Sequence, residues 1–534
     1  MIPTIQILVI LLAVIAAVAV VASRLKIPPS ILLVITGVIL AVIPGLPAVT
    51  LAPEVVLLLV LPPVIYSSAV AMSWREFRFN LRSISLLAVG CVIFTTVTTA
   101  AAVHWLLAFP WAVGFTLGAI ISPPDAVAPL AIVRRMKLPK RLAFVLEGEG
   151  LANDATALIL YRFAVVAVSA GSFSFGRAVG TFAAIVAGEI LWGIGVGWVM
   201  LRLRGWVRET RIEILLSILT PFLAYWPPEM LGGSGVVATM TAGLYISWNG
   251  LRLISAATRL QGIFFWDFLI YLIEGMVFLI TGLQARALIA NLGGYPISEL
   301  VLSAAIVSGV VIAARFIWVY PAIYLPRWLV PAIQRKDPAP PWQSPFALAF
   351  TGIRGIVSLA AALAIPFTTA SGAPFPHRDL ILFLTFSVIL VTLVGQGLTL
   401  PLIIRALGFP KVGRRERHAD RAEEFAAREQ AVTAAIERLD QLMAENHLTE
   451  EVVHPLRAYH RDRLKQIASR YDGDDRHKNL VETYDALEFQ LIAAERKLIN
   501  DLYRAGKLKD DARRRIEREL DLRDAQLSNL LAEE

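Results

Sequence analysis

The chain has 534 residues, of which 57% are hydrophobic and 17% are charged, and its mean hydropathy is +0.64. This composition is that of a polytopic membrane protein. Residues 1–410 contain 26 Lys and Arg against 15 Asp and Glu, whereas residues 411–534 contain 24 against 27, so the basic excess lies in the hydrophobic part and does not indicate a nucleic-acid-binding protein.

Residues 1–410 contain thirteen hydrophobic segments, separated by loops that are often marked by Pro and Gly. The first has no basic residue before it and is long enough to span a bilayer, so we expect a retained helix rather than a cleaved signal peptide. The eighth is the weakest, because it is short and Pro221 interrupts it. We therefore expect an all-α polytopic membrane protein with about 13 transmembrane helices. The segments are residues 4–23, 29–47, 51–72, 82–108, 111–133, 141–170, 176–201, 211–226, 231–249, 262–285, 297–323, 344–366 and 379–406.

Lys and Arg are concentrated in alternate loops between these segments. One set of loops contains 19 basic residues and the other contains three. Because cytoplasmic loops carry the excess of Lys and Arg, this pattern predicts an N-terminus outside and a cytoplasmic C-terminal part. The first set is Arg24, Lys26, Arg75, Arg78, Arg82, Arg134, Arg135, Lys137, Lys140, Arg141, Arg202, Arg204, Arg208, Arg211, Arg252, Arg259, Arg327, Arg335 and Lys336, and the second is Arg177, Arg286 and Arg378.

Two of the segments contain residues that break a helix. The fifth has three prolines within residues 122–129, and the twelfth has an arginine flanked by glycines within residues 352–355. Irregular backbone at membrane depth occurs where protein or a water-filled cavity satisfies it. Their separation by seven segments fits two six-helix repeats of opposite topology with the seventh helix as linker, an architecture of many secondary transporters. We therefore expect discontinuous fifth and twelfth helices.

The sixth segment contains Glu147, Glu149 and Asp154 in an otherwise apolar run. At about 1.5 Å per residue, Asp154 lies ~18 Å from the start of the segment, near the middle of a ~30 Å hydrocarbon core. An ionisable group at this depth is costly unless paired, and by default it marks an ion pathway. A carboxylate provides oxygen ligands for a hard cation and also binds protons. We interpret Asp154 as the site of a hard cation and a proton, with a structural Asp–Arg pair as the alternative.

Glu149 and Arg354 also lie partway into their segments. Left unpaired, each would cost roughly 2.5–3.5 kcal/mol, so we expect a bidentate ion pair that fixes the sixth helix against the broken twelfth. Asp125 follows two prolines, where its carboxylate can neutralise the N-terminus of a half-helix. Asn153 can bridge the broken chain with its amide.

Five more charged residues lie within the segments. We expect them to form internal pairs or to reach the membrane surface from a helix end, not to take part in transport. They are Arg162, Glu189, Asp267, Glu274 and Arg315.

Four short motifs stand out along the chain: LPP at 61–63 before Tyr66, SPPDAVA at 122–128, EGEGLANDATAL at 147–158 and GIRGIVSL at 352–359. Together they resemble the bacterial sodium/proton antiporters of the monovalent cation:proton antiporter-1 family, over roughly residues 5–406. The resemblance implies that Asp154, with Asn153 beside it, binds the cation or the proton, that Asp125 lies at the break, and that a glutamate–arginine pair lies nearby. It also implies a homodimer in the bacterial inner membrane and no cofactor.

The chain departs from this family pattern at two positions near the expected site. Relatives often carry an acidic residue in the third segment, where this chain has Tyr66, Ser67 and Ser68, and a serine where it has Gly150. Both differences remove oxygen ligands. Ser67 or Ser68 can supply a neutral oxygen instead.

One titrating carboxylate predicts the coupling. The empty site is negative and the site holding Na+ or H+ is neutral, so only loaded forms cross the membrane barrier at low cost. We expect 1:1 electroneutral exchange of cytoplasmic Na+ or Li+ for external H+ by alternating access, serving pH and sodium homeostasis. A K+/H+ antiporter of the same fold is the alternative. A cation channel is weaker because no filter-like run is present, and no catalytic motif indicates an enzyme.

Residues 411–534 are rich in charges, with helical patterns over residues 421–446 and 481–502. Leu487, Leu491 and Leu498, together with Phe489, are expected to pack between helices or across a dimer. We expect residues 1–410 to form the transmembrane exchanger domain. Residues 411–534 would then form a cytoplasmic helical domain that regulates the exchanger or stabilises a dimer.

Overall fold

The computed structural model describes residues 2–44, 52–136, 138–170, 175–250, 253–290, 292, 295–370, 372–445, 449–471 and 475–532. Within these ranges the chain is helical, and its only extended pairing is an isolated bridge between Thr368 and Pro374. Contacts divide the chain into Met1–Gly413 and Arg414–Glu534. Residues 45–51, where the second expected segment ends and the third begins, lie outside the described residues, as do Lys137, Arg252 and Asn446.

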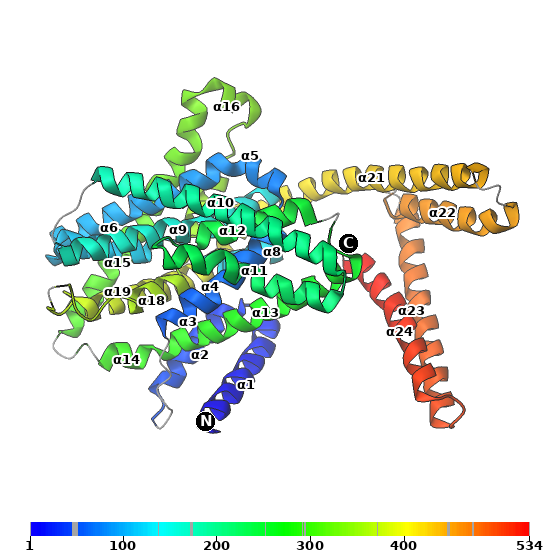
Figure 1. Cartoon of the computed structure of the whole chain (residues 1–534), viewed down its shortest axis with the longest axis horizontal. Coiled ribbons are helices and arrows are strands. Elements are labelled where there is room, and N and C mark those ends of the chain that lie inside the picture. Colours follow the sequence, from blue (N-terminus) through cyan, green and yellow to red (C-terminus); the bar gives the residue numbers. More distant parts are fainter. Residues whose placement is uncertain are drawn as a thin grey trace. The chain divides into compact units, whose positions relative to one another are not determined.

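The first unit is built from apolar helices packed side by side (Figure 1). In its described part, eight helices are long and apolar enough to cross a membrane, and two shorter apolar helices accompany them. The unit is therefore an all-helical membrane protein, and the count of 13 spans stays a prediction. Its first half contains α1 (Ile2–Leu25), α2 (Pro29–Val42), α3 (Pro53–Val55), the π-helical stretch η1 (Val56–Val60), α4 (Leu61–Ala71), α5 (Trp74–Ser85), η2 (Leu86–Cys91), α6 (Val92–Leu107), α7 (Trp111–Ile121), α8 (Val127–Arg135) and α9 (Lys140–Ala170).

The second half of this unit contains the other predicted break. The fifth expected segment is divided into α7 and α8, and the twelfth into α17 and α18, as predicted.

The eighth expected segment is not interrupted at Pro221, so that prediction is wrong. Helix α11 continues through Pro221, because helices in a membrane tolerate proline where neighbouring groups satisfy the freed backbone atoms. The helices of the second half of this unit are α10 (Phe175–Val207), α11 (Thr210–Met230), α12 (Val236–Asn249), α13 (Ala256–Leu283), α14 (Ala285–Ala290), α15 (Ile297–Leu329), α16 (Pro331–Lys336), α17 (Gln343–Phe350), α18 (Ile356–Leu363), α19 (Arg378–Leu390), the π-helical stretch η4 (Val391–Gln396) and α20 (Gly397–Ala406).

Two glycines bring α2 and α13 into backbone contact. A Cβ added at Gly37 would lie 2.8 Å from Cα of Gly282, and one added at Gly282 would lie 2.8 Å from Cα of Gly37. Small residues at a helix interface allow this approach in a membrane, where close packing replaces the hydrophobic effect as the driving force. The backbones of α2 and α13 are therefore in direct contact.

A buried carboxylate caps α12. Glu189 on α10 accepts hydrogen bonds from the backbone N–H groups of Ser234, Gly235 and Val237, at 2.6, 3.1 and 3.1 Å. These are among the free donors at the N-terminus of a helix, where a negative charge is also favoured by the helix dipole. The expected internal partner of Glu189 is thus a helix end and not an arginine.

Three arginines meet at Asp337, in the loop after α16. Arg82 and Arg327 donate to Oδ2 at 2.7 and 2.6 Å, and Arg141 donates to Oδ1 at 2.6 Å. Burial raises the pKa of Asp337, but the hydrogen bond and charge of Arg141 and the charges of Arg327 and Arg82 outweigh it, so the pKa lies below its ordinary value of 3.8. This carboxylate ties together the ends of α5, α9 and α15.

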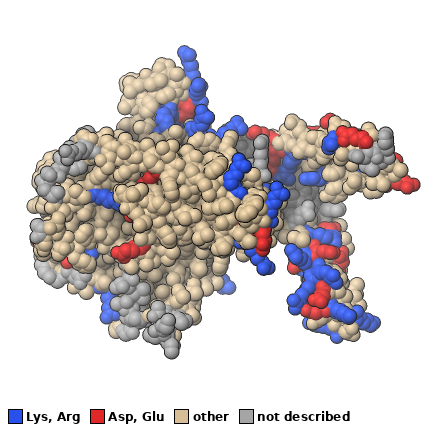
Figure 2. Space-filling model, viewed as in Figure 1, with Lys and Arg blue, Asp and Glu red and all other residues tan. Residues whose placement is uncertain are grey.

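The second unit consists of helices covered with charges of both signs, whereas charged side chains are sparse on the visible face of the first unit (Figure 2). Arg496 pairs with Asp521 at 2.8 Å, and Arg523 pairs with Glu488 at 2.6 Å, between α23 and α24. Leu487, Leu491 and Leu498 are more than half exposed, so the expectation that they pack between helices of this chain is wrong. The helices are α21 (Phe409–Glu445), α22 (Glu450–Tyr471), α23 (Asp475–Arg504) and α24 (Asp510–Ala532).

Replacing the helix cap should destabilise the first unit. We expect Glu189→Ala to lower the thermal unfolding temperature of the purified protein by several degrees, because each buried donor left unpaired costs about 1–3 kcal/mol. Glu189→Gln, which keeps one acceptor oxygen, should be milder. The control is Glu54→Ala, because Glu54 is exposed. Equal unfolding temperatures for Glu189→Ala and the control would contradict the capping role.

Asp337→Asn should lower the unfolding temperature at pH 7, because three guanidinium groups lose a charged acceptor. A carboxylate with a depressed pKa contributes stability above its unfolded pKa and loses it as the pH falls through the folded pKa. The difference between wild type and variant should therefore stay constant from about pH 7 to pH 5 and shrink below about pH 4. A difference that has already vanished at pH 5 would argue against this network.

Candidate functional site

The two breaks meet in the interior of the first unit. The backbone N–H of Asp125, between α7 and α8, donates to the carbonyl oxygen of Ile353, between α17 and α18, at 2.7 Å. Asn153 on α9 donates from its side-chain amide to the carbonyl oxygen of Pro124 at 2.7 Å. The amide therefore contacts one end of the broken chain, whereas its Oδ1 has no partner among the described residues, so bridging of both ends stays a prediction. We call this contact between the two breaks the crossing. It positions α9 as well as the half-helices α7, α8, α17 and α18.

Charged side chains complement the half-helix ends at this crossing. The Arg354 guanidinium donates to the carbonyl oxygen of Ile121 at 3.0 Å and to that of Gly352. Asp125 accepts the backbone N–H of Val127, at the N-terminus of α8, at 3.0 Å. A positive charge at a helix C-terminus and a negative charge at an N-terminus are both favourable. Backbone, amide and charged groups thus all contribute hydrogen bonds at the crossing, while Oδ2 of Asp125 and Oδ1 of Asn153 have no partner among the described residues.

Glu149 pairs with Arg315 and not with Arg354. Arg315 on α15 donates to Oε1 and Oε2 of Glu149 at 2.5 and 2.9 Å, and both side chains are 1% exposed. Arg315 also donates to the carbonyl oxygen of Leu348 near the end of α17. The predicted Glu149–Arg354 pair is wrong, because the carbonyl oxygens freed by the α7 break provide enough acceptors for Arg354.

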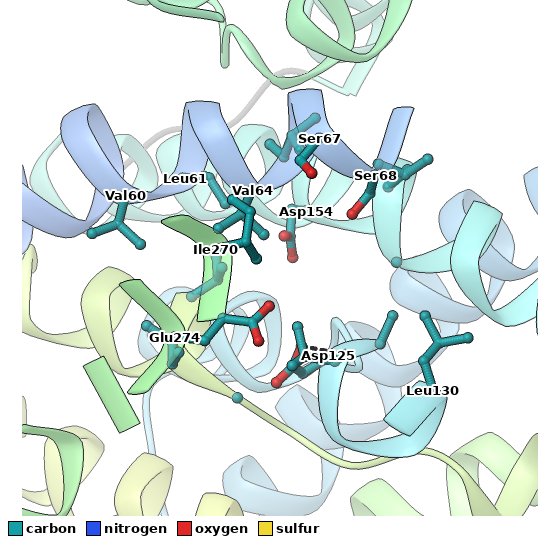
Figure 3. Close-up of a pocket in the computed structure, with 18 of the residues that line it drawn as sticks. Val60, Leu61, Val64, Ser67, Ser68, Asp125, Leu130, Asp154, Ile270 and Glu274 are labelled. Atoms are coloured by element: carbon teal, nitrogen blue, oxygen red, sulfur yellow. Dashed lines mark hydrogen bonds between the residues drawn. The ribbon is translucent and has the colours of Figure 1, made fainter. Parts of the chain in front are cut away.

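A cavity of about 380 Å³ lies beside the crossing. Asp154 on α9 points into it, and Ser67 and Ser68 on α4 and Asp125 at the break point toward the same space (Figure 3). The described residues that line the cavity include no Lys, Arg or His. Asp154 forms no ion pair with the described residues, so the alternative of a structural Asp–Arg pair has no support.

Of the predicted site residues, Asp154, Asp125, Ser67 and Ser68 line this cavity, whereas Asn153 is buried beside it. Five further polar residues among those described line the cavity, and the sequence analysis assigned none of them to the site: Glu147, Asp267, Tyr271, Glu274 and Ser358. It expected Asp267 and Glu274 to form pairs or to reach the surface. The signal for the residues on α13 was helical spacing, because positions 267, 270, 271 and 274 fall on one face of that helix.

Two glycines explain how the chain fits around the crossing. A Cβ at Gly355 would lie 2.6 Å from Cβ of Asp125, so only glycine leaves room for this aspartate. A Cβ at Gly150 would overlap Cβ of Ala126. A serine at position 150 therefore has no space in this arrangement.

The carboxylates around the cavity are spread over its walls. No group of three His, Cys, Asp or Glu side chains within the described ranges is close enough together to hold a metal ion. The cavity is large enough for several water molecules.

Comparison with known proteins decides the family. Residues 9–406 match the family described as sodium/hydrogen exchanger, transmembrane. The chain belongs to the sodium/hydrogen exchanger family. Members of this family are secondary transporters and not enzymes, and this exchanger is a multi-pass membrane protein.

Relatives of this exchanger extend over most of its length. It is 35% identical to an uncharacterized Na+/H+ exchanger of Mycobacterium tuberculosis, over 97% of this chain and 96% of the relative. It is 33% identical to the sodium, potassium, lithium and rubidium/H+ antiporter of Bacillus pumilus, over 71% of this chain and 58% of that protein. The chain also superposes on the structure of the sodium proton antiporter MjNhaP1 from Methanocaldococcus jannaschii with a TM-score of 0.59. The match covers 76% of this chain and 98% of the MjNhaP1 chain. At 19% sequence identity, this likeness shows a shared fold.

A double-mutant cycle should identify the partner of Glu149. Removing one member of a buried pair typically costs about 3–5 kcal/mol, because the other charge is left uncompensated. We expect Glu149→Ala and Arg315→Ala to show a large coupling in thermal unfolding, so that the double variant is more stable than the sum of the single effects predicts. The matched cycle with Arg354→Ala should show a smaller coupling. The reverse order would restore the pair that the sequence suggested.

Proposed function

We propose that this exchanger moves a monovalent cation and a proton in opposite directions, with both ions competing for the carboxylate of Asp154. The observation that carries this proposal is the placement of Asp154: it faces a cavity whose described lining contains no cationic side chain. A carboxylate in such a place has only a mobile cation or a proton to neutralise it.

Coupling follows from the cost of moving charge through a low-dielectric region. An empty site carries one more negative charge than a site that holds Na+ or H+, so the empty form crosses the barrier more slowly. Because either ion adds one positive charge, the two loaded forms have equal net charge. The exchange is then 1:1 and electroneutral, and a proton gradient drives Na+ or Li+ out of the cell.

The cavity lining also suggests a direction of access. Asp267 and Tyr271 are exposed and line the cavity from the part of α13 nearer its N-terminus. The basic loops assign that end to the cytoplasm, with the N-terminus of the chain outside. The cavity then opens to the cytoplasm of a bacterial cell, across its inner membrane, and the exchanger serves pH and sodium homeostasis.

The wider architecture belongs to the same proposal. Two six-helix repeats of opposite orientation, giving 13 spans, would place α7–α8 and α17–α18 at equivalent positions, and the crossing of these two breaks supports this. We assign residues 1–410 to the exchanger domain. Residues 411–534 form a cytoplasmic tail that regulates it or stabilises a homodimer, and exposed Leu487, Leu491 and Leu498 on α23 support the dimer contact.

K+/H+ exchange is the second candidate. The Bacillus pumilus relative is described as an antiporter of sodium, potassium, lithium and rubidium. A cavity of about 380 Å³ with dispersed oxygen ligands selects only weakly between monovalent cations by size. A broad specificity that includes K+ is therefore compatible with the same site and the same mechanism.

Proteoliposomes that contain the full-length protein test the proposal. Addition of Na+, Li+ or K+ to vesicles with an acidic interior should raise the internal pH in wild type. Asp154→Asn should reduce this response to the level of empty vesicles, because the amide neither binds a proton nor neutralises a cation. Clamping the membrane potential at different values should leave the wild-type rate nearly unchanged.

Asp379→Asn is the matched control, because Asp379 lies at the start of α19 with a side chain about half exposed. It should exchange ions like wild type. Full activity of Asp154→Asn would show that another carboxylate carries the ions. An exchange rate that follows the membrane potential would refute electroneutral exchange. A response to K+ but not to Na+ or Li+ would favour K+/H+ exchange, the second candidate.

A further inference from the structure

One face of α13 lines the cavity with acidic side chains at two depths. Asp267, Ile270, Tyr271 and Glu274 are spaced by three, one and three residues, which places them on one side of a helix, and all four line the cavity. Asp267 is exposed, whereas Glu274 is partly buried two turns further along α13. The α13 wall therefore leads from an exposed carboxylate to a deep one.

The carboxylate of Glu274 is directed toward the space between Asp154 and Asp125 (Figure 3). Within the part of the chain that the structure describes, it has no hydrogen bond and no ion pair, and the lining offers no cationic side chain. Removing a carboxylate from water without a partner is costly. An ion from solution is the available compensation.

A second and independent feature is the hydroxyl of Ser358 on α18. This side chain is 2% exposed and lines the cavity, and its Oγ has no hydrogen-bond partner among the described residues. Buried hydroxyl groups are nearly always paired, so an unpaired one at the wall of a cavity indicates a ligand there. A hydroxyl oxygen is a suitable ligand for a hard monovalent cation.

We propose that Glu274 is a second cation-binding carboxylate, which acts with Asp154 and the hydroxyl of Ser358 on the same transported cation. In this arrangement α13 supplies a carboxylate oxygen to the site, whereas α4 supplies only the hydroxyl oxygens of Ser67 and Ser68. The inference rests on the function proposed above, because it concerns the site at which Asp154 exchanges its cation for a proton.

This role of Glu274 preserves electroneutral exchange. Electroneutral exchange requires only that Glu274 keep the same protonation state while Asp154 alternates between cation and proton, because the two loaded forms then have equal net charge. With Glu274 ionised, the empty site carries one more negative charge than it would with Asp154 as its only exchanging carboxylate. Because the cost of moving charge into a low-dielectric region rises steeply with the charge, the empty form crosses even less readily, and exchange is more tightly coupled.

The test measures cation binding and transport in the full-length protein with three variants. Glu274→Gln should raise the concentration of Na+ that gives half-maximal exchange by about tenfold or more, because the site loses one of its charged ligands, while the maximal rate changes less. Glu274→Asp keeps the charge and should recover most of the affinity. Ser358→Ala should raise the half-saturating concentration by a smaller factor.

Thermal unfolding of the purified protein over a series of Na+ concentrations gives a second readout that does not require transport. The concentration for half-maximal stabilisation should rise by the same factor in Glu274→Gln. Glu213→Gln is the matched control: Glu213 is a buried glutamate on α11 that does not line the cavity, and its replacement should leave both half-saturating concentrations unchanged.

The outcomes separate this inference from the function on which it rests. If Asp154→Asn abolishes exchange but Glu274→Gln keeps the wild-type half-saturating concentrations in both readouts, the inference is overturned and the proposed function stands. Equal impairment of Glu274→Asp and Glu274→Gln would assign Glu274 a structural role and also overturn it. Unimpaired exchange by Asp154→Asn would instead refute the proposed function itself.

Discussion

The structure of the membrane unit depends on one constraint: the backbone groups freed by two broken helices must be satisfied where no bulk water is available. The backbone N–H of Asp125 at one break donates a hydrogen bond to the carbonyl oxygen of Ile353 at the other, so each break provides a partner for a backbone group of the other. The guanidinium of Arg354 takes carbonyl oxygens at the end of α7. The amide of Asn153 then ties α9 to the same crossing and fixes the position of its neighbour, Asp154.

Two kinds of buried charge in this unit differ in their chemistry. Glu149 and Arg315 neutralise each other at 1% exposure, and a well-formed buried pair of this kind is fixed in place because separating it is costly. Asp154 and Glu274 face a cavity whose described lining holds no cationic side chain. Fixed pairs thus hold the helices together, whereas the unpaired carboxylates remain available to ions that come and go.

The sequence allowed the helical membrane unit and both breaks to be predicted, because prolines and glycine-flanked arginine in apolar runs have few structural solutions. It placed Asp154 at mid-membrane by simple counting. It could not choose the partner of Glu149, since Arg315 and Arg354 both lie at suitable depth and only the fold shows which guanidinium is needed for backbone carbonyls. Glu274 was expected to form an internal pair or to reach the membrane surface for a similar reason: residue spacing identifies a helix face but does not show what that face contacts.

The contact between Gly37 and Gly282 has a mechanical consequence for any rearrangement that moves the cavity from one side of the membrane to the other. Packed helices usually slide on a layer of interdigitated side chains that can change rotamers. Here the two backbones touch directly, and no such layer separates them. We therefore expect helices α2 and α13 to move together, and any shear during such a rearrangement to occur on the other faces of these two helices.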